Sequence, residues 1–243
     1  EDPGVAAQYG IVRGALDAQL ARQARLQAEA TMAPAIEFAA ELRERAAEPN
    51  VADVQAREQA LFTSRRSALE EQVRLIRTQI AQIRHEMEAL AEQRKTEAEA
   101  QRLADEELDS YESLLDKQYV AEVRILAQKR LVAEYKSRTE ERDAESARAR
   151  QRVTDLELRI AGLRDEYVAR AAEELKESGV SVLELRERLQ PTEDALRRQS
   201  IVAPVGGRVI GLRVHTEGAT IGPRDPLMDI VPANEKLLIE AQA

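Results

Sequence analysis

The sequence predicts a mainly α-helical protein, with a long antiparallel coiled-coil hairpin, an extra helix at the stem of the hairpin, and a small β lobe at the C-terminal end. Ala, Glu, Arg, Leu and Gln dominate residues 1–200, which is typical of long helices. Apolar residues recur at alternating steps of four and three through the middle of the chain, which indicates a coiled-coil seam. Five of the ten glycines lie within residues 201–222, among short β-rich runs, which indicates strands and turns.

The composition excludes several classes of protein. Of the 243 residues, 33% are charged and only 3% are aromatic, so we expect a narrow seam in place of a thick core. The net charge is −9 with both signs finely mixed, and the lack of a basic stripe argues against a nucleic-acid partner. The chain has no cysteine, which excludes disulfides and thiol chemistry. It begins with Glu1 and has neither a signal peptide nor an apolar run of about 18 residues, so we interpret it as a fragment whose membrane anchor, if any, lies upstream.

The first 48 residues are predicted to form a helix and a connector. Apolar residues at helical spacing predict an amphipathic helix over about residues 5–31, which Pro34 ends. A short helical piece follows within the connector. The pair Pro49-Asn50 marks the next boundary, where Asn50 is a favourable N-cap.

Residues 49–199 are predicted to form the long hairpin. The frame does not slip over the first arm, where the expected seam positions are Leu69, Val73, Ile76, Ile80, Ile83, Met87, Leu90, Arg94, Glu97, Gln101, Ala104, Leu108, Tyr111 and Leu115. The expected seam positions of the second arm are Ala121, Ile125, Gln128, Val132, Tyr135, Thr139, Arg142, Ser146, Ala149, Val153, Leu156, Ile160, Leu163 and Tyr167. Each arm spans roughly 65 residues, so the rod is predicted to be roughly 100 Å long.

The two seams mirror each other about Gln118, which predicts that the arms fold back on one another with a tip near residues 117–120. Ile76 then meets Ile160, and the polar stretches of the two arms meet each other, where Glu97 is placed to pair with Arg142. A parallel dimer of two chains is the alternative. In such a dimer, the seam of the second arm would not need to mirror the seam of the first arm. We interpret the polar stretch as a device that fixes the register.

Beyond Tyr167 the apolar frame shifts by one residue, which alters the supercoil locally. The shifted positions are Ala171, Leu175, Val182, Leu185, Leu189 and Leu196. We expect this segment to pack against the first helix and to form a three-helix stem. Pro191 is expected to kink or interrupt the second arm.

Residues 200–243 carry the β lobe, and part of this segment resembles a known family. The matching positions are Ala203, Pro204, Gly207, Val214, Gly218, Pro226, Leu227, Met228, Ile230, Val231 and Pro232. They resemble the second half of the lipoyl-like domain of haemolysin-D-type membrane-fusion (periplasmic adaptor) proteins of type I secretion systems. That family inserts a helical hairpin between two lipoyl half-motifs. The resemblance therefore covers most of the chain and implies a lipoyl-like half-domain followed by the start of another β segment.

The resemblance also implies a function and partners. It implies an adaptor that links an inner-membrane ABC transporter to a TolC-type outer-membrane channel for protein secretion, with other copies of itself alongside. The expected location is the periplasm, with an anchor in the inner membrane through a segment missing from this fragment. Alternatives are an adaptor of a drug or polysaccharide efflux system, a carrier with a lipoyl arm, and a coiled-coil scaffold.

In this family the hairpin tip contacts the channel, and the family's tip pattern is an arginine, a leucine and a small hydroxyl residue. The matching positions here are Ser110, Leu114 and Ala121, of which only Leu114 fits the pattern. The predicted docking tip comprises Ser110, Leu114, Lys117, Tyr119, Val120, Ala121 and Arg124. The alternative is that the apolar tip residues only cap the coiled coil.

No residue pattern points to catalysis, a metal or a cofactor. His85 lies between seam positions and is expected to face solvent, and neither it nor His215 has a metal-ligating partner at helical spacing. Asn234 occupies the position at which a lipoyl or biotin carrier has its lysine, so no cofactor is expected. We therefore do not expect an enzyme.

Overall fold

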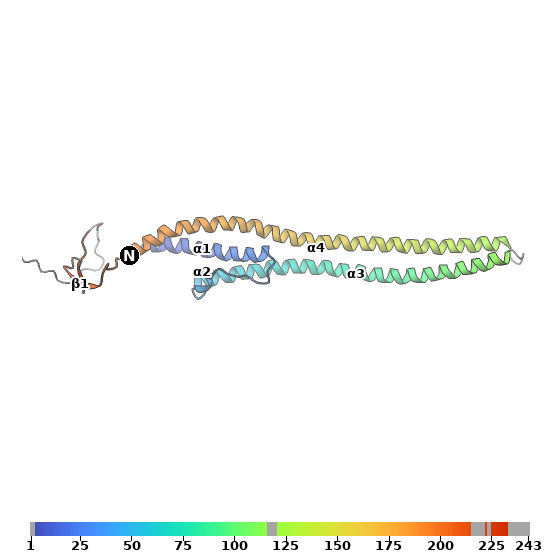
Figure 1. Ribbon diagram of the computed structural model, residues 1–243, viewed down its shortest axis with the longest axis horizontal. Helices are drawn as coiled ribbons and strands as arrows, with labels where there is room; N and C mark the ends of the chain where they lie inside the picture. Colours follow the sequence, from blue (N-terminus) through green and yellow to red (C-terminus); the bar gives the residue numbers. More distant parts are fainter. Residues whose placement is uncertain (1–2, 116–120, 215–221, 223–224, 233–243) are drawn as a thin grey trace, which may run out of the picture. The chain divides into compact units, whose positions relative to one another are not determined.

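The computed structural model describes residues 3–115, 121–214, 222 and 225–232. Its elements are α1 (Pro3–Ala30), α2 (Ala40–Glu44), α3 (Pro49–Leu115), α4 (Glu122–Gln199), β1 (Gly207–Ile210) and β2 (Asp229–Pro232) (Figure 1). The chain divides into two compact units. One unit is Gly14–Leu185, and the other joins Glu1–Arg13 to Arg186–Ala243.

Within the unit Gly14–Leu185, α3 and α4 form the predicted antiparallel hairpin (Figure 1). The ion pairs that cross the hairpin show that the two helices are antiparallel. As the residue number rises along α3, the number of its partner on α4 falls. These cross-hairpin pairs are Glu86–Arg152 at 2.8 Å, Arg94–Asp143 at 2.6 Å and Glu112–Lys129 at 2.8 Å. The antiparallel arrangement inferred from the mirrored seams is confirmed.

The predicted seam frame is also confirmed on both arms. Among the described side chains, every expected seam position is buried or half-buried, with the exceptions of Arg94 and Ala121. Ile76 and Ile80 are almost fully buried, and Ala149 is completely buried. A period of 3.5 residues keeps these side chains on the side of each helix that faces its partner.

The polar stretch of the seam brings Glu97 and Arg142 together, as predicted. Glu97 Oε1 lies 3.5 Å from Arg142 Nε, and Arg142 also binds Glu145 on its own helix at 2.5 Å. Glu97 Oε2 and Arg142 Nε are nevertheless buried without a hydrogen-bond partner among the described residues. The polar stretch is therefore less well satisfied than the apolar seam on either side of it.

The α1 helix is the third helix of the stem. Its C-terminal half buries Leu16, Leu20 and Leu26 within the unit Gly14–Leu185. The helix ends at Ala30, and Met32 follows in the left-handed region with φ of 53°. Because the chain then reverses, it can return to the start of α3 through the connector.

The connector packs back onto α1 through α2. Leu42 of α2 is fully buried, and Arg45 binds Asp17 of α1 at 2.9 Å. The prediction that Asn50 caps the next helix is wrong, because α3 begins one residue earlier, at Pro49. Proline suits the first helical position because it has no N–H group that would be left without a partner there.

The second unit contains the end of α4 and the β lobe. The prediction of an interruption at Pro191 is wrong, since α4 continues through it to Gln199. One missing N–H removes one helical hydrogen bond, and here the helix tolerates it. In the lobe, β1 and β2 pair antiparallel in the register Gly207 to Pro232 and Ile210 to Asp229.

Candidate functional site

The predicted docking tip lies where α3 ends and α4 begins, within the unit Gly14–Leu185. Ser110 is exposed, and its hydroxyl donates a hydrogen bond to the Glu106 carbonyl at 2.9 Å. Leu114 is half-buried in the last turn of α3. Ala121 is exposed, and its carbonyl accepts a hydrogen bond from the Arg124 N–H at 2.9 Å, in the first turn of α4. The other predicted tip residues, Lys117, Tyr119 and Val120, lie outside the described residues.

Contacts between the two arms hold the described part of the tip. The guanidinium of Arg124 lies 5.2 Å from the centre of the Tyr111 ring, within the range of a cation–π contact. The Tyr111 hydroxyl in turn donates to Glu107 at 2.6 Å. The buried side chain of Gln128 donates from α4 to the Ala104 carbonyl of α3 at 2.9 Å. Arg124 is thus positioned by the opposite arm.

Two apolar side chains close to the tip are exposed. Val123 is 77% exposed and Leu126 is 51% exposed, both in the first two turns of α4. Neither belongs to the seam, so the hairpin itself does not account for them. Exposed apolar side chains beside an anchored arginine form a surface suited to contact with another protein.

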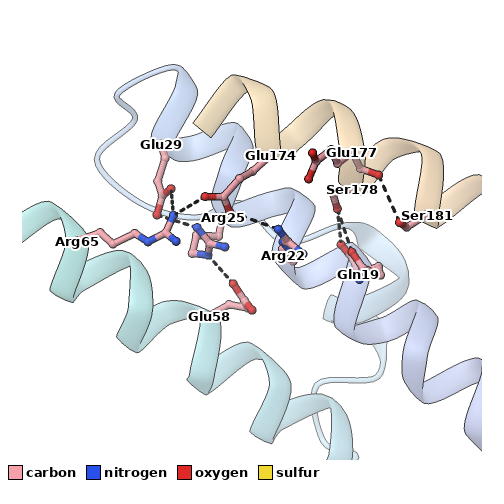
Figure 2. Close-up of polar contacts among 10 residues, drawn as sticks. All are labelled: Gln19, Arg22, Arg25, Glu29, Glu58, Arg65, Glu174, Glu177, Ser178 and Ser181. Atoms are coloured by element: carbon pink, nitrogen blue, oxygen red, sulfur yellow. Dashed lines mark hydrogen bonds and ion pairs between the residues drawn. The ribbon is translucent and has the colours of Figure 1, made fainter. Parts of the chain in front are cut away.

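A second polar cluster lies in the stem, where α1, α3 and α4 meet (Figure 2). It comprises Arg22, Arg25, Glu29, Glu58, Arg65 and Glu174. Three arginines face three glutamates, so the cluster is electrically balanced. Sequence reasoning did not find it, because each member taken alone reads as an ordinary charge on a helix surface.

The centre of this stem cluster is the pair Arg25–Glu29, whose side chains are 2% and 1% exposed. Arg25 binds Glu29 at 2.9 Å and Glu58 of α3 at 2.5 Å. Burial lowers the pKa of Arg25, but its bonds to Glu58 and Glu29 outweigh that effect and raise the pKa. The guanidinium therefore stays charged, and it ties α1 to α3.

The α4 helix joins the stem cluster through Glu174. This carboxylate lies 3.4 Å from Arg22 of α1 and 3.5 Å from Arg65 of α3 (Figure 2). Further along the same helices, the Ser178 hydroxyl donates to the Gln19 side chain at 3.2 Å. The cluster thus connects all three stem helices.

A groove of about 330 Å³ opens beside the stem cluster, and Glu29, Arg65 and Tyr167 are among its lining residues. The Tyr167 hydroxyl is buried and has no hydrogen-bond partner among the described residues. Burial raises the pKa of Tyr167 above its usual value. No nucleophile paired with a base lines this groove in the described part of the chain.

The described residues contain no group of three or more His, Cys, Asp or Glu side chains that could hold a metal ion. His85 is 83% exposed, as predicted for a position between seam residues, and lies 3.1 Å from Glu88. His215 lies outside the described residues. Among the helices described, none has an apolar stretch long enough to cross a membrane.

The fold, the tip and the stem cluster define a long α-helical hairpin protein with a third helix at its stem. The chain belongs to the family described as "AprE, long alpha-helical hairpin", whose sequence model matches residues 5–195.

Named relatives belong to protein secretion systems. The chain is 34% identical over 238 residues to the type I secretion system membrane fusion protein PrsE of Rhizobium meliloti (strain 1021), covering 98% of this chain and 54% of that protein. It is 33% identical over 220 residues to the alkaline protease secretion protein AprE of Pseudomonas aeruginosa, covering 90% and 51%. The chain thus spans about half the length of these relatives.

A solved structure has the same fold. The crystal structure of the soluble domain of LipC, a membrane fusion protein of a type I secretion system, matches with a TM-score of 0.76 and 27% identity. The match covers 96% of this chain and 88% of that one. The resemblance to type I secretion membrane fusion proteins noted from the sequence is therefore confirmed.

Proposed function

We propose that the protein is a periplasmic adaptor of a type I protein secretion system, which links an inner-membrane ABC transporter to a TolC-type outer-membrane channel. The observation that carries this proposal is the long hairpin itself, shared with relatives whose names assign them to type I secretion and to protease secretion. A rod held by a continuous seam is suited to bridge a distance, because its helices rise about 1.5 Å per residue.

The tip is the proposed contact with the channel. It combines an arginine positioned by the opposite arm, Arg124, with the exposed apolar residues Val123 and Leu126. We include the other predicted residues of the tip, Lys117, Tyr119 and Val120, in the same contact. We also propose that the protein is anchored in the inner membrane.

We also propose that three segments have separate roles. Residues 1–48 form the stem helix and connector, residues 49–199 form the hairpin that spans the distance, and residues 200–243 form a half-domain. The lobe leaves Ile201 71% exposed and Val202 79% exposed. Apolar residues exposed to this degree support a half-domain that needs another segment to cover it.

Site-specific photocrosslinking in cells tests the adaptor role. A photoreactive residue at Val123, introduced into the full-length protein, is expected to crosslink to an outer-membrane channel. Val180 is the matched control, since it is also an exposed valine of α4 but lies near the stem. Crosslinks to the channel from both positions, or from Val180 alone, would refute docking through the tip.

The names of the relatives favour protein export over drug or polysaccharide efflux. Two properties of cells that lack the gene are compared with those of wild-type cells. The first is secretion of a protein substrate, and the second is resistance to small toxic molecules. Loss of secretion with unchanged resistance is the expected result. The reverse result would favour the efflux alternative.

A further inference from the structure

Two cross-hairpin ion pairs lie on one edge of α3 and α4, four heptads apart. Arg84 lies 3.2 Å from Glu157, and Glu112 lies 2.8 Å from Lys129. Position 112 is 28 residues, or four heptads, beyond position 84, and position 129 is the same number of residues before position 157. Equivalent positions on this edge therefore hold opposite charges in both of these pairs.

One heptad closer to the stem, the same two positions hold two arginines, Arg77 and Arg164. Both side chains are exposed, and neither has an ion-pair or hydrogen-bond partner among the described residues. Arginine stays charged at every physiological pH, so this charge cannot be relieved by losing a proton. Like charges at facing positions are unfavourable, and an anionic partner would turn that cost into an attraction.

Arg77 and Arg164 also line a groove of about 420 Å³, together with Arg74. Four arginines and one glutamate line this groove in all. The seam residues Leu69 and Val73 contribute apolar side chains to it. The occupant that fits is therefore a helix that presents carboxylates on either side of an apolar side chain.

The chain carries such a surface itself, at the same level of α4. Asp155, Leu158, Gly162 and Asp165 follow each other at steps of three, four and three residues, so they share the face of the helix that points away from the seam. Leu158 is 65% exposed, and an added Cβ at Gly162 would meet nothing within 4 Å. Neither aspartate has a partner among the described residues.

We propose that the groove of Arg77 and Arg164 binds the Asp155–Asp165 stripe of a second copy of this chain. The carboxylates pair with the guanidinium groups, Leu158 contacts the apolar side chains of the groove, and Gly162 allows the helices to approach closely. The two surfaces differ, so the contact is heterologous and each copy can use both surfaces at once. The inference rests on the part of the proposed function in which copies act side by side, and it identifies their contact surfaces.

Charge reversal tests the contact in the 243-residue chain. Arg77→Glu with Arg164→Glu, and separately Asp155→Arg with Asp165→Arg, should each weaken self-association about tenfold, measured by sedimentation equilibrium at low salt. An equal mixture of the two variants should restore wild-type association, because each reversed groove then meets a reversed stripe. Lys95→Glu with Arg148→Glu, at two exposed cations elsewhere on the hairpin, is the matched control and should leave association unchanged. Circular dichroism checks that all variants keep their helices.

Cysteine crosslinking locates the contact, because the wild-type chain has no cysteine. A Leu158→Cys chain mixed with a Met32→Cys chain should form a disulfide-linked dimer, since Met32 lines the groove. A Thr78→Cys chain, exposed on α3 at a similar level, should not.

Three results would overturn the inference. They are a wild-type chain that does not self-associate, association that neither reversal weakens, and equal crosslinking of Leu158→Cys to Thr78→Cys. Binding of inorganic phosphate or anionic vesicles to the groove without self-association would overturn it too. If these results occur while Val123 still crosslinks to a channel, the contact surface is wrong and the adaptor role stands. If self-association behaves as expected but the tip fails to crosslink, docking through the tip is wrong and the contact between copies stands.

Discussion

Individual charged residues decide how the stem is held together. Arg25 and Glu29 are four residues apart on α1, a spacing that usually describes an exposed helical ion pair. Their burial depends on α1 packing against two helices far away in the sequence, so it could not be predicted. The Glu97–Arg142 pair could be predicted, because both arms interrupt their apolar seam at the same level.

Glu29→Gln is expected to lower the free energy of unfolding by about 3 kcal/mol, because breaking a buried ion pair leaves its partner uncompensated. Arg25 keeps Glu58, so the loss should lie at the low end of the usual range. Urea unfolding followed by circular dichroism measures the change. The control is Glu86→Gln, which breaks a half-exposed cross-hairpin pair and should cost less than about 1 kcal/mol. Equal losses in the two variants would contradict a special role for the buried pair.

Tyr167→Phe is expected to stabilise the stem by about 1 kcal/mol at neutral pH, since it removes a buried hydroxyl that lacks a hydrogen-bond partner. Burial raises the pKa of Tyr167 in the folded state above its unfolded value of about 10. The unfolded chain therefore loses this proton first, so the titration of Tyr167 leaves the stability unchanged below a pH of about 10 and lowers it as the pH rises toward the folded pKa. The advantage of the phenylalanine variant should grow at alkaline pH. Thermal unfolding of both proteins at pH 8 and pH 10.5 measures this, and a constant difference would contradict it.

At the scale of the elements, periodicity predicted more than local signals did. The seam frame of α3 and α4 holds over many heptads, so a single misplaced residue does not change the prediction. The ends and interruptions depend on single residues, and there the predictions failed for the N-cap at Asn50 and for an interruption at Pro191. A helix as long as α4 is held by its packing, so one proline does not end it.

Gly207→Ala is expected to separate β1 from β2. A Cβ at this position would clash with the Val231 carbonyl oxygen, which is backbone and cannot rotate away. Hydrogen exchange of the β1 and β2 amides should become about tenfold faster, corresponding to ~1.4 kcal/mol. The neighbouring Gly206→Ala is the matched control, since a Cβ there meets nothing within 4 Å. Equal exchange in both variants would show that the strand pairing does not need the close approach at Gly207.

At the scale of the whole molecule, the two arms must be matched to each other in length. The ion pairs that cross the hairpin run in opposite order along α3 and α4, and the polar stretches meet where Glu97 lies 3.5 Å from Arg142. The sequence predicted this matching because both arms lie in one chain. It did not predict the contacts that hold α1 and α2 to the stem, such as Arg45 with Asp17, because no mirror or repeat relates those segments.

Removing one heptad from each arm at mirrored positions, residues 84–90 and 146–152, should leave a shorter hairpin with its register intact. Seven residues of helix correspond to about 10 Å, so the distance between spin labels at positions 124 and 170 on α4 should fall by about that amount. Helicity and cooperative thermal unfolding should persist. Removing residues 84–90 alone keeps the seam frame but shifts every pair on the stem side of the deletion by seven residues. Ile76 then no longer meets Ile160, and the melting temperature should fall clearly below that of the matched deletion. Equal stability of the two deletion variants would mean that the arms have no preferred register, and the mirrored seam would then not be what specifies the hairpin.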